Sequence, residues 1–182
     1  MNTAASKSAA DQRRVRGPWI GAAIALGLIA AAFAASPYDI AAIGGVKASL
    51  KVPEFGLIAR QSLTLKLHLL AALTALAVGV VIMLRPKGVG LHKTLGWSWV
   101  LAMMVTAVSS LFLTGLNGDR MSLIHLLSGW TIVALPIGVT AIARRKVNVH
   151  RRMMTGLFVG GLLVAGGLTF LPGRLMWAVF FG

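Results

Sequence analysis

Residues 63–84 read LTLKLHLLAALTALAVGVVIML, an apolar stretch with one lysine, one histidine and no acidic side chain. A helix rises about 1.5 Å per residue, so this stretch is long enough to cross a hydrocarbon layer about 30 Å thick. It lacks the strict alternation of apolar and polar residues that a membrane β-strand requires. Four further apolar runs have a similar length and cover residues 19–35, 95–116, 122–143 and 153–171. We therefore predict an all-α, polytopic membrane helical bundle with five transmembrane helices.

The composition of the 182-residue chain agrees with a membrane protein. Hydrophobic residues make up 57% of it and charged residues 12%, and the mean hydropathy is +0.83. A net charge of +14 would suggest nucleic-acid binding in a soluble protein. Here the placement of the charge indicates membrane topology instead, so we expect the lipid bilayer as partner and no nucleic acid.

The basic residues gather in segments that alternating spans place on one side of the membrane. Twelve of the 18 fall in the N-terminal tail and two loops: Lys7, Arg13, Arg14, Arg16, Arg85, Lys87, Lys93, Arg144, Arg145, Lys146, Arg151 and Arg152. Cytoplasmic loops carry an excess of such residues. We predict a multi-pass protein of the bacterial inner membrane, with a cytoplasmic N-terminus and a periplasmic C-terminus.

The same reasoning divides the chain into segments. They are a cytoplasmic basic tail (1–18), a first transmembrane helix (19–36), an external loop (37–62), a four-helix core (63–172) and an external C-terminal tail (173–182). The first span also has features of a secretory signal peptide, because arginines precede it and small residues follow at 31–36. Cleavage there would leave four helices.

All four histidines of the chain recur in one frame. His92 follows His68 by 24 residues, and His150 follows His125 by 25. Their surroundings also match, since LHLL at 67–70 corresponds to IHLL at 124–127, and LHK at 91–93 to VHR at 149–151. This predicts that the core is a duplicated two-helix repeat, with a histidine near the start of each helix.

This spacing predicts metal ligands at two depths in the membrane. Because sequential helices alternate in direction, His68 and His125 fall at the outer face, and His92 and His150 at the inner one. A haem iron held by two imidazoles needs them at equal depth on facing helices. Within one hairpin they cannot meet, because the rise from His68 to residue 84 is about 24 Å. A single histidine at a membrane interface needs no cofactor, but the shared frame favours axial ligands of one or two haem b groups.

Small residues near the histidines have two interpretations. Ala72 and Gly79 share a helix face with His68, while Gly96 and Gly129 each follow a histidine by four residues. Such positions would leave room for a porphyrin. They would equally allow close packing of helices through small side chains.

Two resemblances bear on this core. The segment from residue 63 to 171, with GLHKTLG at 90–96 and VHRRMM at 149–154, resembles a bacterial family of predicted membrane proteins, domain of unknown function 2306. That family implies a membrane protein and no particular activity. The four-helix, four-histidine layout is also similar to the core of cytochrome b561. This similarity implies that His68 and His125 hold an outer haem, and His92 and His150 an inner one.

The sequence thus predicts a cytochrome-like protein that relays electrons across the bilayer, with a quinone or another redox partner and an electron-transfer oxidoreductase activity. No Asp or Glu lies within a span, which argues against a proton pump. The main alternative is a non-enzymatic accessory or assembly subunit of a larger membrane complex, docked through aromatic residues such as Trp19, Phe112 and Trp177. A zinc or copper site on the outer histidine pair is a further option.

Overall fold

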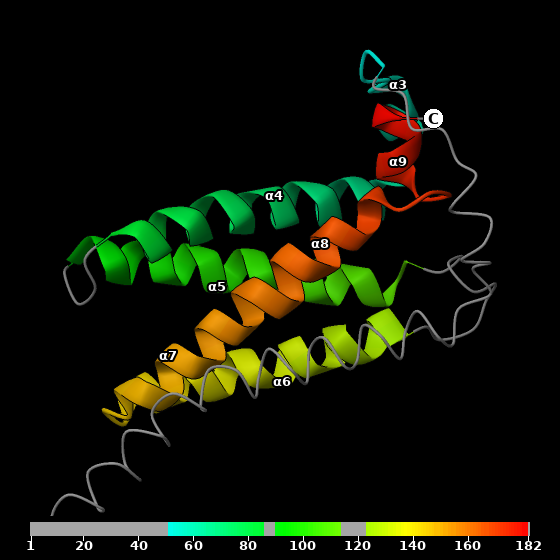
Figure 1. Ribbon diagram of the computed structural model, residues 1–182. Helices are drawn as coiled ribbons and strands as arrows, with labels where there is room; N and C mark the ends of the chain where they lie inside the picture. Colours follow the sequence, from blue (N-terminus) through cyan, green and yellow to red (C-terminus); the bar gives the residue numbers. More distant parts are fainter. Residues whose placement is uncertain (1–50, 86–89, 114–122, 182) are drawn as a thin grey trace, which may run out of the picture.

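The computed structural model describes residues 51–85, 90–113 and 123–181 of the chain. Every regular element in these ranges is helical (Figure 1). Three of the long helices are α4 (Leu63–Leu84), α5 (Gly90–Leu111) and α6 (Leu123–Ala143). The fourth is continuous through α7 (Val147–Gly156), η1 (Leu157–Val164), α8 (Ala165–Gly167) and η2 (Leu168–Phe170). All four are long and apolar enough to cross a membrane. The predicted first span, residues 19–36, lies outside the described residues.

The helix starts follow polar signals as well as hydropathy. α4 begins after Ser62, whose Oγ accepts a hydrogen bond from the Leu65 N–H at 3.2 Å, and it ends before Arg85, which is extended and precedes Pro86. Its bounds are those predicted. α5 begins at Gly90 rather than at residue 95, and the fourth helix at Val147 rather than 153. Hydropathy marks only the part within lipid, whereas these helices continue into charged residues at the membrane surface.

Two backbone hydrogen bonds form the turn between α6 and α7. The Lys146 N–H donates to the Ala141 carbonyl at 2.8 Å, and the Arg145 N–H to the Ile142 carbonyl at 2.9 Å. This pair of bonds is a Schellman motif, in which the residue after the helix adopts a left-handed conformation that glycine favours. Here that residue is Arg145, with φ of 58°.

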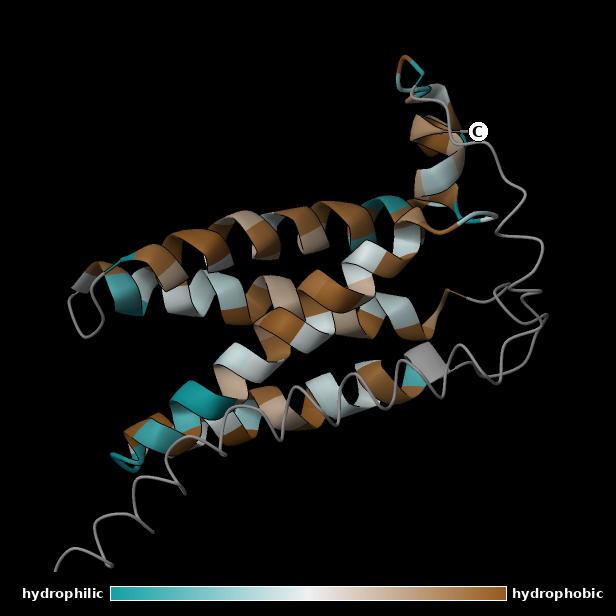
Figure 2. Ribbon diagram, in the orientation of Figure 1, coloured by the Kyte–Doolittle hydropathy of each residue, from teal (hydrophilic) through white to brown (hydrophobic). Residues whose placement is uncertain are grey.

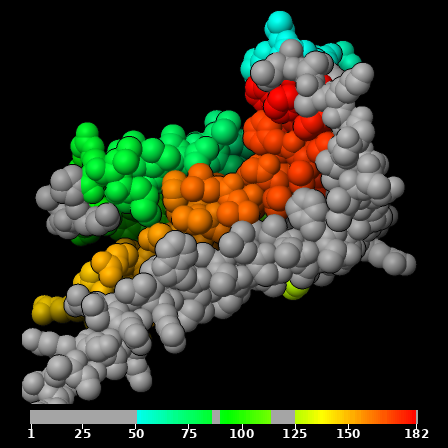
Figure 3. Space-filling view, in the orientation of Figure 1, coloured from blue at the N-terminus to red at the C-terminus, as the bar shows by residue number. Residues whose placement is uncertain are grey.

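The short links make the helices pair as predicted. α4 packs against α5, and α6 against α7, as two antiparallel hairpins. α5 also packs against α6, and η1 contacts both α4 and α6. Figure 3 shows the fourth helix, in orange, lying directly against the α4–α5 hairpin. α4 and α6 therefore rest on α5 and η1 rather than extensively on each other. The duplication of the two hairpins stays a prediction.

The core lies in the middle of the bundle, where a glycine admits two aromatic rings. A Cβ added at Gly79 of α4 would come within 2.5 Å of the Phe158 ring and 2.8 Å of Trp99 Nε1. Phe158 belongs to η1, which is a π-helix. In α6 the helix continues through Pro136 without a break. Nine buried side chains form this core: Ala75, Trp99, Ala102, Met103, Ala134, Leu135, Leu157, Phe158 and Leu162.

The outer surface of α4 is apolar over most of its length, with a hydrophilic turn near its start (Figure 2). Leu63 is 70% exposed, Leu70 65% and Leu84 81%. Water would disfavour so large an apolar face, whereas lipid tails solvate it. This surface agrees with the membrane assignment.

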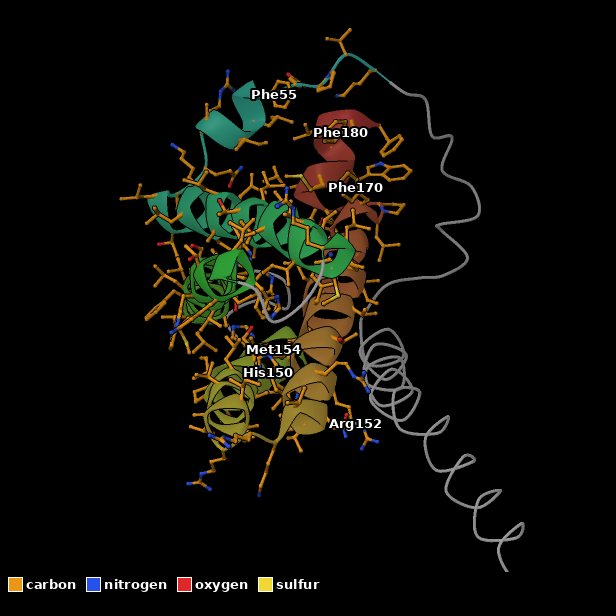
Figure 4. The ribbon with its side chains drawn as sticks, turned by 90° about the vertical axis from the view of Figure 1, so that its left-hand side faces the viewer. Phe55, His150, Arg152, Met154, Phe170 and Phe180 are labelled. Carbon is orange, nitrogen blue, oxygen red and sulfur yellow. The ribbon has the colours of Figure 1, made fainter. Side chains whose placement is uncertain are left out.

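The two ends of the bundle differ, and we name them for what they carry. At the α9 end, the predicted C-terminal tail forms a short helix, α9 (Leu175–Phe180), which packs near α3 (Gly56–Ala59). The Lys51 N–H donates to the Phe180 carbonyl at 3.1 Å, and the rings of Phe170 and Phe180 are 5.8 Å apart (Figure 4). The basic end carries the last residues of α4, the first residues of α5 and the α6–α7 turn.

Candidate functional site: two histidine layers

His68 on α4 is hydrogen-bonded to α5. Its Nδ1 lies 3.0 Å from the Thr106 carbonyl oxygen and 3.1 Å from Ser109 Oγ. A carbonyl oxygen can only accept, so the ring hydrogen must be on Nδ1. In the neutral imidazole the lone pair is then on Nε2. The neighbouring helix thus fixes both the tautomer and the orientation of this ring.

His125 lies near the start of α6, at the same end of the bundle. Its side chain is 8% exposed. Three residues further along α6, Ser128 is hydrogen-bonded to Ser110 of α5. Four buried polar side chains occur among the residues described, and all belong to α5 or α6: Ser110, His125, Ser128 and Thr131.

These contacts show the relative levels of the two histidines at the α9 end along the bundle axis. His68 is level with Thr106 and Ser109, and Ser110 is level with Ser128, three residues from His125. The levels of the two histidines along the bundle axis therefore differ by less than about two helical turns, at the α9 end. We call this set the polar layer: His68, Thr106, Ser109, Ser110, His125 and Ser128. Direct pairing of the two imidazoles stays a prediction.

The other two histidines lie at the basic end. The Nδ1 of His150 on α7 is 2.9 Å from the carbonyl oxygen of Gly138 on α6, so this ring also carries its hydrogen on Nδ1. Gly138 is buried, and a side chain there would collide with Met154, one turn beyond His150. Figure 4 shows His150 and Met154 on the side of α7 that faces α6. His92, the third residue of α5, is partly exposed at the same end.

Sequence reasoning found the histidines but not their partners. Two of those partners are the backbone carbonyls of Thr106 and Gly138, which no residue letter reveals. The Ser109–Ser110 pair within an apolar span was the available signal, because a polar side chain in lipid needs a partner. Trp99 was also missed: its buried Nε1 has no hydrogen-bond partner within the described ranges.

A metal site made of protein ligands alone is not found in the described part of the chain. No group of three or more His, Cys, Asp or Glu side chains lies close enough there to hold a metal ion. Its one carboxylate side chain, Glu54, pairs with Lys51 at 3.3 Å, at the α9 end. A zinc site usually needs three or four protein ligands, whereas haem iron needs at most two.

Comparison with known proteins gives the family. The family of predicted membrane proteins known as DUF2306 matches residues 65–178, a range that holds all four histidines and most of each of the four spans. No curated protein and no solved structure is found to match. The chain therefore belongs to the DUF2306 family and is a multi-pass, helical membrane protein.

Proposed function

We propose that the chain is a b-type cytochrome-like protein that relays electrons across the bilayer, as its similarity to the cytochrome b561 core implies. His68 and His125 would hold a haem b at the α9 end, and His92 and His150 a second one at the basic end. The positive-inside rule then puts the basic end in the cytoplasm and the C-terminus in the periplasm of a bacterial inner membrane. A quinone or another carrier would exchange the electrons.

The observation that carries the proposal is the hydrogen bonding of two of the rings. His68 and His150 each donate Nδ1–H to a carbonyl oxygen on the neighbouring helix, at 3.0 and 2.9 Å. Histidines that bind a metal through one nitrogen almost always donate the other N–H in this way. The bond leaves Nε2 available as a ligand and holds the ring against rotation.

Two glycines beside the histidines support the proposal further. A Cβ added at Gly129 or at Gly96 would meet nothing within 4 Å, and each glycine follows a histidine by four residues, on the same helix face. Gly79 in the core differs, because side chains fill the space above it. Open space therefore lies beside these two histidines, as it also does at Gly156, Gly166 and Gly167, and it permits a flat group there without requiring one.

The chemistry of the ligand set favours haem over a bare ion. Haem iron takes four nitrogens from its own ring and needs only two imidazoles from the protein. When bound, it would gain and lose one electron at a time. The chain's own residues would supply the two neutral imidazoles. Thr106 and Ser109 would hold His68 in place, and the apolar core would keep water out.

The test is the absorption spectrum of the full chain, purified in mild detergent from cells supplied with haem. We expect a Soret band and, after reduction with dithionite, sharp α bands of a b-type cytochrome. His68→Ala should remove a spectral component. The matched control is Leu70→Ala on the exposed face of the same helix, which should keep it.

Circular dichroism separates loss of the ligand from loss of the fold, since a folded His68→Ala protein retains its helical signal. A folded wild-type protein with a featureless spectrum after haem supplementation would refute the cytochrome. That result would favour the accessory or assembly subunit instead.

A further inference from the structure

The basic end has a positive surface with no acidic side chain beside it in the described part of the chain. Seven exposed cationic side chains lie there: Arg85, Lys93, Arg144, Arg145, Lys146, Arg151 and Arg152. The carboxylate of Glu54, the one acidic side chain in the described ranges, is at the opposite end and pairs with Lys51. Five of the seven cations come from the short α6–α7 hairpin region, residues 144–152.

Arg145 occupies a position at which arginine is disfavoured. Its φ of 58° is left-handed, and at this position of a Schellman motif glycine is the usual residue because it has no Cβ. The two hydrogen bonds of the motif are both present, so the turn is well formed around this arginine. A residue that costs stability within a regular turn points to a use for its side chain. Here the neighbours on both sides, Arg144 and Lys146, are cationic as well.

The first two turns of α7 extend this cationic surface. The Arg151 guanidinium lies 3.4 Å from Asn148 Oδ1, on the exposed side of the helix. Arg152 also points away from the bundle, whereas Met154 faces α6 (Figure 4). The surface begins where two candidate membrane spans end, at Ala143 and Val147, and this position would place it near the phospholipid headgroups.

We propose that the α6–α7 turn is a binding site for the headgroups of anionic phospholipids. Arginine side chains donate paired hydrogen bonds to phosphate oxygens, and three consecutive cations can surround one headgroup. The membrane position decides the source of the phosphate, because lipid headgroups are concentrated where α6 ends and α7 begins. This proposal does not depend on haem binding.

The test uses the full chain in zwitterionic detergent, titrated with phosphatidylglycerol or with phosphatidylcholine, and followed by native mass spectrometry. We expect tighter binding of phosphatidylglycerol. Arg145→Gly should weaken it about fivefold, as expected for one cation near a membrane surface. The same substitution should raise the melting temperature without lipid, because glycine suits this turn. Arg60→Gln, at the α9 end, is the control and should leave phosphatidylglycerol binding unchanged.

The Arg145→Gly variant separates the proposed role from a structural one. If it melts higher but binds phosphatidylglycerol as the wild type does, the site is refuted. The lipid assignment is also overturned if inorganic phosphate at an equal concentration displaces the lipid. It is likewise overturned if a DNA duplex binds more tightly than phosphatidylglycerol and Arg145→Gly weakens that binding as well. In detergent the protein is not inserted into a bilayer, so its orientation across a membrane does not affect the measured binding.

Discussion

The two ends of the bundle carry the same histidine frame in different surroundings. At the α9 end, His68 is hydrogen-bonded to the Ser109 hydroxyl of α5, and His125 is buried three residues from Ser128 on α6. At the basic end, His150 is held by a carbonyl, but it lies beside exposed arginines, and His92 is partly exposed. A buried, neutral environment favours an imidazole ligand. We therefore expect the α9 end to hold haem more firmly than the basic end.

The largest expected effect tests whether the histidines act in pairs. His68→Ala and His125→Ala should each remove the same spectral component completely, and His92→Ala and His150→Ala the other one. Absorption spectra recorded during a redox titration resolve the two components. Four unrelated phenotypes would contradict pairing across the hairpins.

The next test compares a glycine in the core, Gly79, with a glycine that follows a histidine by four residues, Gly129. Gly79→Ala should lower the free energy of unfolding by about 1–3 kcal/mol, because the new methyl group would collide with Phe158 and Trp99. Gly129→Leu has open space and should leave stability nearly unchanged while lowering the haem content. Denaturation in detergent and the haem-to-protein ratio measure the two effects. Equal haem content in Gly129→Leu and wild type would place the haem elsewhere.

A smaller effect is expected from the hydrogen bond between α5 and α6. A double-mutant cycle on Ser110→Ala and Ser128→Ala should give a coupling energy of about 0.6 kcal/mol, the average for hydrogen bonds between membrane helices. A cycle that pairs Ser110→Ala with Thr94→Ala, near the other end of α5, is the control and should give none. Additive effects in both cycles would mean that the serine contact does not stabilise the bundle.

The smallest effect should come from Ser109→Ala. His68 keeps its bond to the Thr106 carbonyl, so the haem should stay bound. Loss of the second partner should shift the midpoint potential of the His68 component alone, because hydrogen bonds to an axial ligand tune the iron. A shift in both components, or a loss of haem, would be inconsistent with a positioning role for Ser109.

The sequence predicted the positions of the described spans from their apolar length, whereas the histidine site, chosen by residue type, stays a prediction. α4 has the bounds predicted from its apolar run, and in the structure a serine cap and the position before a proline mark its two ends. The starts of α5 and α7 were missed by five and six residues, because helical hydrogen bonds persist beyond the apolar run. The four histidines were identified, but the carbonyls of Thr106 and Gly138 become partners only through packing. The contact between Gly79 and Phe158 likewise depends on where η1 crosses α4.

The hydrogen bonds from Lys51 to Phe180 and from Glu54 to Val179 bear on how the protein should be handled. They connect the segment before α4 to α9, the last described helix. The two ends of the described chain are therefore held together by backbone hydrogen bonds. A purification tag fused after residue 182, or a deletion of α9, would disturb the segment that leads into α4, which begins five residues before His68. Affinity tags are therefore better placed at the N-terminus.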